Sequence, residues 1–464
     1  MISSLALLAL VPSFLIGNAM VIDGTGKPAF SADVRIEGER IVAVGQLEPI
    51  AGEQVIDARG LTLAPGFIDA HSHADGNLDK LESQLRQGIT TAICGQDGGR
   101  PASVREQKEK TKQAPIRFEF FSGHGGLREA AMKSLSRKAA PFEIRRMEAL
   151  LEEDMKAGAL GLSTGLEYDP GHYSSTEELI ALSKKAERHG GMYISHVRDE
   201  SHEMLESVRE VLRIGREARL PAQISHIKMG VASVWGKSAE VIRMVEKARA
   251  AGQAVTADVY PYLYWQSTIR VLTVSRDYGN RKVWESALAD VGGAKNVRLT
   301  SYSPNSTWVG KTLEQLSKET GKDAPSLIIE IVNATAEGKG RESVLVSAMT
   351  EEDLTAFVRQ PWIMFSSDGS GGGSHPRSAG SFPRVLARYV RDLKVISLEE
   401  AIRKMTSLPA RTFKLHDRGV VKPGMSADLV LFDAKTIRDT ATPENPTSMA
   451  VGVKSVFVRG TKQL

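Results

Sequence analysis

A regular alternation of helix-like and strand-like segments runs through the middle of the chain. Apolar residues recur at helical spacing in four amphipathic segments, at residues 142–157, 176–189, 204–218 and 239–251. Short β-rich runs alternate with them at residues 159–163, 192–196, 222–226 and 254–258, and equivalent positions in these runs are 32, 30 and 32 residues apart. A strand, a helix and two loops need about thirty residues, and such a crossover makes successive strands parallel. The pattern therefore predicts repeated βα units.

Each of these β-rich runs closes on a polar residue, namely Ser163, His196, His226 and Asp258. In a closed (β/α)8 barrel the carboxyl ends of the strands converge on one site. A doubly wound open sheet would show the same local rhythm, so the pattern alone leaves both architectures open. At the start of the second helical segment, Ser175 and Glu178 have the spacing of a capping box.

The two ends of the chain follow a different pattern. Short β-rich runs separated by turns occupy residues 32–36, 40–44 and 54–57, and the same style returns at 426–432 and 453–458. We therefore expect a small β domain built from residues 1–60 and 415–464, with a barrel over residues 61–414 between them. Residues 275–345 lack the βα rhythm and are expected to form an insertion in the barrel.

The N-terminal stretch allows two interpretations. Residues 5–11 are apolar and no charged residue precedes Asp23, so the basic segment typical of an export signal is missing. Residues 1–12 are either the remnant of such a signal or part of an apolar N-terminal strand, and residues 14–21 are expected to form a strand. Cytoplasmic and periplasmic or secreted locations both stay open.

Composition narrows the class of protein. The 464 residues are 41% hydrophobic and 25% charged, which excludes collagen-like, coiled-coil and disordered chains. The net charge of +4 is small and dispersed, so nucleic acid and membrane surfaces are not expected partners. The single cysteine, Cys94, excludes an intrachain disulfide and a zinc site built from several cysteines.

Histidines at the expected strand ends suggest a metal site. His71 and His73 lie two residues apart in an apolar run, so both side chains can project to one face of a strand. Alone, such a pair is better explained by two core imidazoles. Together with His196, His226 and Asp368, which closes the apolar run 362–368, it fits a transition-metal site at a barrel mouth.

Several motifs resemble those of the amidohydrolase superfamily and, more closely, its D-aminoacylase (N-acyl-D-amino-acid deacylase) family. They extend over nearly the whole chain, at residues 65–73, 88–91, 123–128, 162–168, 195–200, 224–228, 260–262, 367–369, 375–377, 382–386 and 422–428. The resemblance implies a distorted (β/α)8 barrel that carries one or two catalytic divalent metal ions, with Zn²⁺ the expected ion.

The resemblance also implies the metal ligands, which are His71, His73, Asp97, His196, His226 and Asp368. Asp97 is a departure, because it stands in Gly95-Gln96-Asp97-Gly98 where the family typically has a cysteine ligand, and Cys94 lies outside that position. Without the resemblance, Asp97 would be interpreted as a turn residue. A carboxylate can nevertheless bind and bridge such ions. Residues 159–163 offer no lysine for the carbamylated bridge found elsewhere in the superfamily.

The implied reaction is hydrolysis of the amide of an N-acyl-D-amino acid, or of a dipeptide with a C-terminal D-residue. A bound metal would activate the water and polarise the carbonyl. The superfamily gives Asp368 the role of general base and then acid. Lys228 and Tyr168 best match the family's substrate-binding positions, Arg377 is close behind, and Tyr260 and Arg270 are weaker matches.

Other interpretations stay open at this stage: an amidohydrolase acting on another linear or cyclic amide, or a non-catalytic barrel that binds metal. Asp368 disfavours the second, because a structural metal site is normally closed and needs no base. A homo-oligomer is compatible with each of them. His124 and His375 have no assigned role, and the four remaining histidines are expected to be solvated.

Overall fold

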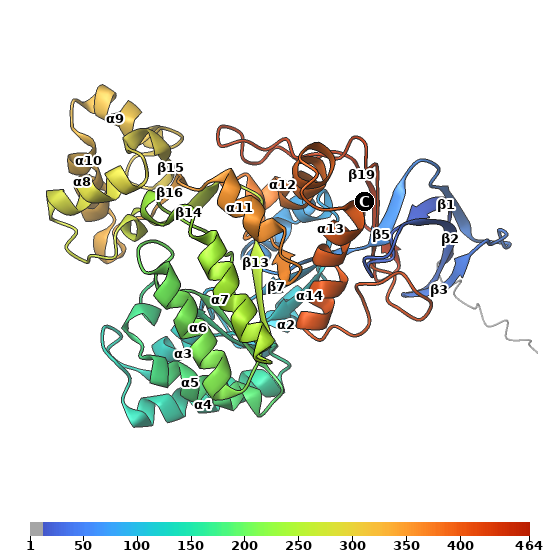
Figure 1. Ribbon diagram of the computed structural model, residues 1–464, viewed down its shortest axis with the longest axis horizontal. Coiled ribbons are helices and arrows are strands. Elements are labelled where there is room, and N and C mark those ends of the chain that lie inside the picture. The colour runs from blue at the N-terminus through green and yellow to red at the C-terminus, as the bar shows by residue number, and fades with distance from the viewer. Residues whose placement is uncertain (1–12) are drawn as a thin grey trace, which may run out of the picture.

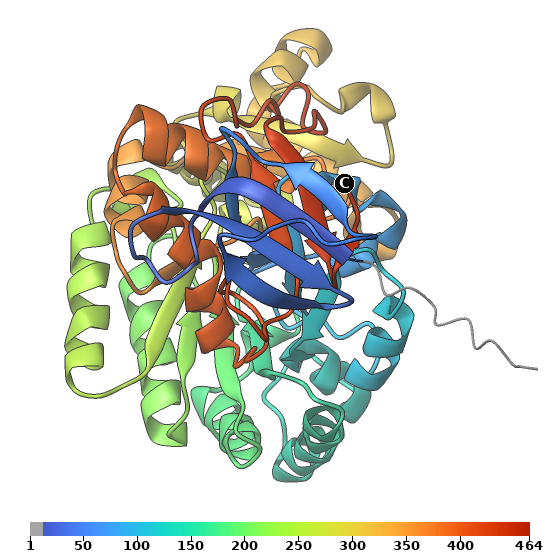
Figure 2. The ribbon, with the colours of Figure 1, turned by 90° about the vertical axis from the view of Figure 1, so that its right-hand side faces the viewer.

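The computed structural model describes residues 13–464 and places strands from both ends of the chain in one sheet (Figure 1). The members are β1 (Ser13–Val21), β2 (Phe30–Glu37), β3 (Arg40–Gly45), β4 (Gln54–Asp57), β5 (Thr62–Pro65), β18 (Leu429–Phe432), β19 (Val453–Val458) and β20 (Thr461–Lys462). Their order is β20-β19-β18-β5-β1-β2-β3, with β4 paired to β1. Figure 2 shows strands from the beginning and from the end of the chain together in this sheet.

The chain ends meet where β5 runs antiparallel to β18, with Leu63 opposite Leu431. Apolar side chains from both segments, among them Phe14 and Phe457, whose ring centroids are 5.2 Å apart, form a separate core on this sheet. The strand expected over residues 14–21 is confirmed as β1. The boundaries of the two expected domains stay a prediction, and residues 1–12, for which a signal remnant and an apolar strand were both open, lie outside the described residues.

Eight parallel strands form the central layer. They are β6 (Phe67–Asp69), β7 (Ile89–Cys94), β8 (Arg117–Phe120), β10 (Gly161–Gly165), β11 (Met192–His196), β12 (Ala222–Ile224), β13 (Val255–Val259) and β17 (Ile363–Phe365), and the two-residue β9 (Ser122–Gly123) pairs with β10. Strands β6-β7-β8 form one sheet, and β9-β10-β11-β12-β13-β17 form the other.

The two parallel sheets meet at both of their edges. Leu160 N donates to Phe120 O (2.8 Å) on one side, and Asp368 N donates to His71 O (2.8 Å) on the other. The first and last parallel strands, β6 and β17, are therefore neighbours. An open doubly wound sheet would keep its edge strands apart, so the arrangement is a distorted (β/α)8 barrel.

Helices surround this layer. They are α1 (Glu82–Leu85), α2 (Val104–Thr111), α3 (His124–Ala131), α4 (Pro141–Lys156), α5 (Thr176–Glu187), α6 (Met204–Ala218), α7 (Ser238–Ala250), α11 (Glu351–Val358), α12 (Arg377–Arg384), the π-helical η9 (Val385–Asp392), α13 (Leu398–Met405) and α14 (Ser407–Thr412). The four predicted helices are confirmed as α4, α5, α6 and α7, with ends within two residues of the expected ones. Within residues 13–464, no helix combines the length and apolarity needed to cross a bilayer.

The capping box expected at the start of α5 is only half formed. Ser175 Oγ accepts a hydrogen bond from Glu178 N (3.2 Å), as an N-cap should. The carboxylate of Glu178 does not return to the Ser175 backbone, because it is buried between Arg128 (2.6 Å) and His124 (2.9 Å). The predicted hydrogen bond from the Ser175 backbone to the Glu178 carboxylate is therefore absent, and that part of the prediction was wrong.

Between β13 and α11 the chain leaves the βα repeat and forms a separate group of elements, seen at one end of the molecule in Figure 1. An antiparallel sheet of β14 (Tyr264–Ser267), β15 (Val297–Tyr302) and β16 (Glu342–Ser347) packs with α8 (Arg281–Asp290), α9 (Leu313–Thr320) and α10 (Ala324–Ala334). Short 3₁₀ turns complete the fold at η1 (Ala74–Gly76), η2 (Leu78–Lys80), η3 (Gly171–Tyr173), η4 (Ala232–Val234), η5 (Ile269–Leu272), η6 (Ala294–Asn296), η7 (Ser306–Trp308) and η8 (Ala336–Gly338).

Candidate metal centre and substrate cavity

The six expected ligands meet at the carboxyl ends of the parallel strands. They come from five different strands: His71 and His73 after β6, Asp97 after β7, His196 at the end of β11, His226 after β12 and Asp368 after β17. Parallel strands bring such positions to one mouth of the barrel. Residues up to 297 positions apart in the sequence thus face a common space.

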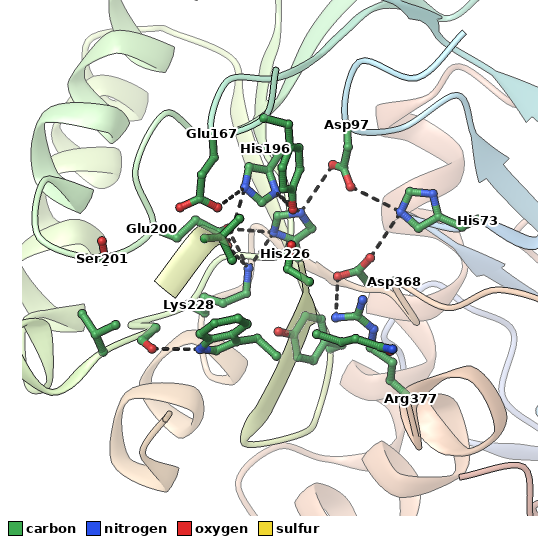
Figure 3. A pocket seen from close by; sticks show the side chains of 18 residues that line it. His73, Asp97, Glu167, His196, Glu200, Ser201, His226, Lys228, Asp368 and Arg377 are labelled. Atoms are coloured by element: carbon green, nitrogen blue, oxygen red, sulfur yellow. Dashed lines mark hydrogen bonds and ion pairs between the residues drawn. The ribbon is translucent and has the colours of Figure 1, made fainter. Parts of the chain in front are cut away.

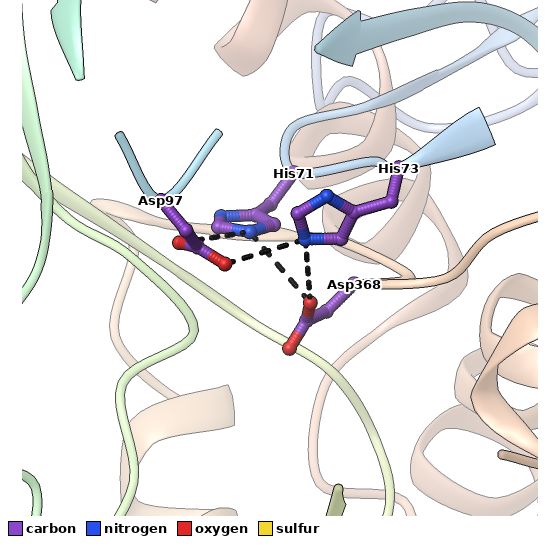
Figure 4. A group of neighbouring side chains, drawn as sticks. All are labelled: His71, His73, Asp97 and Asp368. Carbon is purple, nitrogen blue, oxygen red and sulfur yellow. Dashed lines mark ion pairs between the residues drawn. The ribbon is translucent and has the colours of Figure 1, made fainter. Parts of the chain in front are cut away.

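Four of these side chains form a first group, in which the two carboxylates flank the two imidazoles (Figure 4). Nε2 of His71 is 3.4 Å from Asp97 Oδ1 and 3.6 Å from Asp368 Oδ1. Nε2 of His73 is 3.3 Å from Asp97 Oδ2 and 3.4 Å from Asp368 Oδ1. Ligand atoms at 2.0–2.2 Å from one tetrahedral zinc ion lie about 3.3–3.6 Å from each other. The spacing of this group suits one ion.

A second group shares Asp97 with the first and adds two more imidazoles. Nε2 of His226 is 3.4 Å from Asp97 Oδ1 and 3.0 Å from His196 Nδ1. Since Asp97 belongs to both groups, its carboxylate lies where it could bridge two ions. This is the arrangement that the family resemblance implies for the position that Asp97 occupies.

Buried polar atoms without partners support a metal at this place. His71 is fully buried, and neither of its ring nitrogens has a hydrogen-bond partner; Asp97 Oδ1 also has none. Such atoms are rare in native proteins and call for a ligand. Asp97, His226 and Asp368 also adopt positive φ angles of 54°, 33° and 47°, and strained backbone of this kind concentrates at functional sites. The residues therefore fit a divalent metal.

The two aspartates are held in their ionised form. Burial opposes ionisation of Asp97, but His71, His226 and His73 outweigh it, so the pKa of Asp97 lies well below its usual value. At Asp368 burial acts in the same way, and Arg377 leads the groups that hold its pKa well below the usual value. Carboxylates must be ionised to bind a metal, and these two are.

Two glutamates whose roles sequence reasoning missed support the second group. Glu167 Oε2 lies 2.9 Å from His196 Nε2, and Glu200 Oε1 lies 2.9 Å from His226 Nδ1. In each imidazole the supported nitrogen is the one turned away from Asp97 (Figure 3). A carboxylate behind a histidine ligand fixes the tautomer and the orientation of the ring. Both glutamates stand inside family-like motifs, but no metal-ligand spacing marks them.

Two other buried side chains position parts of the site. Asp258 Oδ1 accepts from His226 N (3.1 Å), which fixes the strained backbone of that histidine. His375 accepts from Arg377 N (2.9 Å) through Nδ1, and its Nε2 donates to Tyr264 O (3.1 Å). Burial holds the pKa of His375 well below its usual value, so this imidazole is neutral and can accept at Nδ1. The previously unassigned His375 thus orients Arg377.

A cavity of about 240 Å³ opens beside the ligand groups and contains four of the five expected substrate-binding residues. Lys228, Tyr168, Arg377 and Tyr260 line it. The guanidinium of Arg377 lies 4.8 Å from the centre of the Tyr260 ring, and Tyr168 Oη lies 3.4 Å from His196 Nδ1.

Arg270, the fifth expected substrate-binding residue, is not brought to this cavity. Its guanidinium pairs with Glu342 (3.0 Å) and donates to Val332 O (2.8 Å), inside the inserted group of elements. His124, the other unassigned histidine, is also remote from the ligand groups, because it belongs to the buried network with Glu178 and Arg128.

Comparisons with known proteins agree with this arrangement. A model of the amidohydrolase family matches residues 54–238 and 331–461, which is more than half of the chain. D-aminoacylase from Alcaligenes xylosoxydans xylosoxydans is 34% identical over 96% of this chain and 93% of its own length. N-acyl-D-glutamate deacylase from the same organism is 34% identical over 96% of this chain and 92% of its own length.

A solved structure matches equally well. The N-acyl-D-glutamate deacylase of Bordetella bronchiseptica, crystallised with zinc and a phosphonate inhibitor that mimics the tetrahedral intermediate, superposes with a TM-score of 0.88. It is 31% identical in sequence, and the match covers 97% of this chain and 96% of that one.

Proposed function

The chain belongs to the amidohydrolase family and within it to the D-aminoacylase family, and from this premise we propose that it hydrolyses the amide bond of N-acyl-D-amino acids. The observation that carries the proposal is the convergence of two metal-ligand groups, joined by Asp97, beside a cavity lined by Lys228 and Arg377. A metal pair suits amide hydrolysis, and the two cations suit the carboxylate of an amino acid.

In this proposal His71, His73, Asp97 and Asp368 hold one ion, and Asp97, His196 and His226 hold the other. Zn²⁺ is the expected ion, in line with the zinc of the Bordetella deacylase. A bound divalent metal supplies Lewis-acid polarisation of the substrate carbonyl and lowers the pKa of water to near neutrality. Every remaining task falls to the side chains of the cavity.

Asp368 is the proposed proton carrier. Its carboxylate is ionised, so it can accept the proton of the attacking water and then deliver it to the nitrogen of the leaving amine. Arg377 contacts Asp368 Oδ2 (2.7 Å), which turns Oδ1 toward His71 and His73. This geometry orients the carboxylate before substrate arrives.

Recognition of the amino-acid carboxylate is proposed for Lys228, Arg377 and Tyr260. The ammonium of Lys228 lies 5.7 Å, and the guanidinium of Arg377 4.8 Å, from the centre of the Tyr260 ring, so the two cations flank one aromatic side chain. We propose that these two cations together bind a single carboxylate. Tyr168 packs against His196, where its hydroxyl can donate to the oxygen that develops charge.

The test is hydrolysis of racemic N-acetyl-leucine by the zinc-loaded protein, with chiral chromatography of the leucine released. We expect D-leucine alone, and the Asp368→Asn variant should release it at least about 100-fold more slowly. Release of L-leucine alone, or of both enantiomers at equal rates, would overturn the proposal. A cyclic amide serves as the substrate of a second assay. If the protein opens that ring but releases no leucine from N-acetyl-leucine, the proposal is also overturned. A homo-oligomer remains part of the proposal, and sedimentation velocity of the same sample tests it.

A further inference from the structure

The positive side chains that line the substrate cavity are few. Among the described residues they are Lys228 and Arg377, and the lining carboxylates are Glu167, Glu200 and the two proposed metal ligands, Asp97 and Asp368. Both cations already have carboxylate partners. Lys228 Nζ lies 2.6 Å from each carboxylate oxygen of Glu200, and Arg377 Nη1 lies 2.7 Å from Asp368 Oδ2. A substrate with one carboxylate therefore engages all the positive side chains that line the cavity.

No lining lysine or arginine in the described chain is left for a second carboxylate. Arg276 lies nearby but does not line the cavity, because its guanidinium pairs with Asp169 (3.2 Å) and donates to the backbone oxygen of Glu167 (3.2 Å). The carboxylates of Glu167 and Glu200, by contrast, both line the substrate cavity (Figure 3). An acidic substrate side chain would meet like charges there, and such a juxtaposition is costly.

Among the described residues, the rest of the cavity wall carries no further carboxylate, lysine or arginine, and apolar residues form part of it beside Ser201, Gln266 and Ser267. Val231 comes from the loop after β12, Val271 from η5, and Trp265 from β14 of the inserted group. The indole of Trp265 is 9% exposed, and its Nε1 donates to Gly230 O (2.9 Å). That bond ties the inserted group to the loop that carries Val231, so the apolar wall is held in place.

From this geometry, and resting on the proposed function, we propose that the chain selects N-acyl-D-amino acids with uncharged, apolar side chains and rejects acidic ones. Overall identity does not decide this, because the D-aminoacylase and the N-acyl-D-glutamate deacylase are both 34% identical to the chain. The cavity decides which side chains are accepted. The apolar part of its wall buries an aliphatic or aromatic side chain, and its two cations are already paired, so a second carboxylate finds no partner.

Three substrates test the selectivity of the zinc-loaded protein: N-acetyl-D-leucine, N-acetyl-D-glutamine and N-acetyl-D-glutamate. The last two have nearly the same shape and differ in charge. We expect kcat/KM to fall in that order, with glutamate about 100-fold or more below leucine, since like charges brought together cost several kcal/mol. A glutamate value within tenfold of the leucine value would overturn the selectivity while leaving the proposed function intact. Hydrolysis of none of the three would instead overturn the proposed function.

Paired substitutions in the apolar wall test where the side chain binds. Val271→Lys adds a cation, and Val271→Met is its control of similar length without charge; Val231→Lys and Val231→Met form a second pair. The readout is the ratio of kcat/KM for the glutamate substrate to that for the leucine substrate. We expect the ratio to rise about tenfold or more in at least one Lys variant relative to its Met control. Equal ratios in both pairs, with folding verified by circular dichroism, would overturn the assignment of this wall.

Discussion

Glu167 offers a test of how the metal site is supported. Its carboxylate contacts His196 Nε2 at 2.9 Å, while His196 Nδ1 faces His226 and the proposed ion. The substitution Glu167→Gln keeps a hydrogen-bond acceptor but removes the charge, and Glu167→Ala removes both. Because Glu167 contacts the second ligand group and not the first, only one of the two proposed ions should be affected.

The expected size of the effect follows from the geometry of this contact. The side chain of His196 is 3% exposed, so water cannot replace the lost carboxylate without rearrangement. Loss of a partner behind a histidine ligand typically weakens metal binding about 10- to 100-fold. That range corresponds to about 1.4–2.7 kcal/mol. We expect Glu167→Gln near the lower limit and Glu167→Ala near the upper one.

The assay is a zinc titration of the metal-free protein against a chromogenic chelator, which resolves two dissociation constants. Glu203→Gln is the matched control, because Glu203 is an exposed glutamate at the start of α6 that has no contact with the ligand groups. In the Glu167 variants one of the two zinc dissociation constants should increase, and the other should stay unchanged. Two unchanged constants in Glu167→Ala would refute the supporting role, and equal weakening of both would refute its restriction to the second group.

Four more substitutions, at three residues, separate the roles of other side chains. Asp97→Asn should lose most bound zinc by elemental analysis, whereas Asp97→Cys should keep it, with a shift in preference from Mn²⁺ toward Zn²⁺, because a thiolate is the softer ligand. Asp368→Asn should retain at least one zinc ion but lower kcat at least about 100-fold, as expected for a lost proton carrier; an unchanged kcat would contradict that role. Burial lowers the pKa of Lys404 to about 7, below its unfolded value of 10.5, so the folded state binds fewer protons between these values. The free energy of unfolding, measured in urea, should therefore rise with pH between 7 and 10. The rise should be steeper in the wild type than in Lys404→Met, by up to about 1.4 kcal/mol per pH unit. The same pH dependence in both proteins would contradict this.

Local patterns carried most of the fold prediction. The period of apolar residues fixed α6 at Met204–Ala218 without error, because one face of that helix is buried along its whole length. The sequence could not decide whether the sheet closes, because that depends on contacts between strands almost 300 residues apart, such as Asp368 N to His71 O. Glu178 shows the same limit, because its distant partners Arg128 and His124 prevail over the local capping box.

The candidate site divides in a similar way. His71, His73, His196, His226 and Asp368 could be proposed from their places at strand ends, and they do meet. Asp97 required the family resemblance, since a carboxylate between glycines has the local signature of a turn.

Glu167 escaped the sequence interpretation because its role depends on the ring of His196, a contact between side chains that no spacing reveals. Arg270 lies apart from the cavity for the opposite reason. It stands close in sequence to cavity residues, but the inserted group of elements supplies it with Glu342 as a partner.

The most direct test is to measure hydrolysis of N-acetyl-D-leucine and N-acetyl-L-leucine by chelator-treated protein as zinc is returned. We expect no turnover without metal, D-leucine release that appears with added zinc and reaches its maximum at no more than two equivalents per chain, and no release from the L-substrate at any point. Full activity without metal, or equal release from the two enantiomers, would contradict the proposal that these residues form a metal-dependent D-amino-acid deacylase.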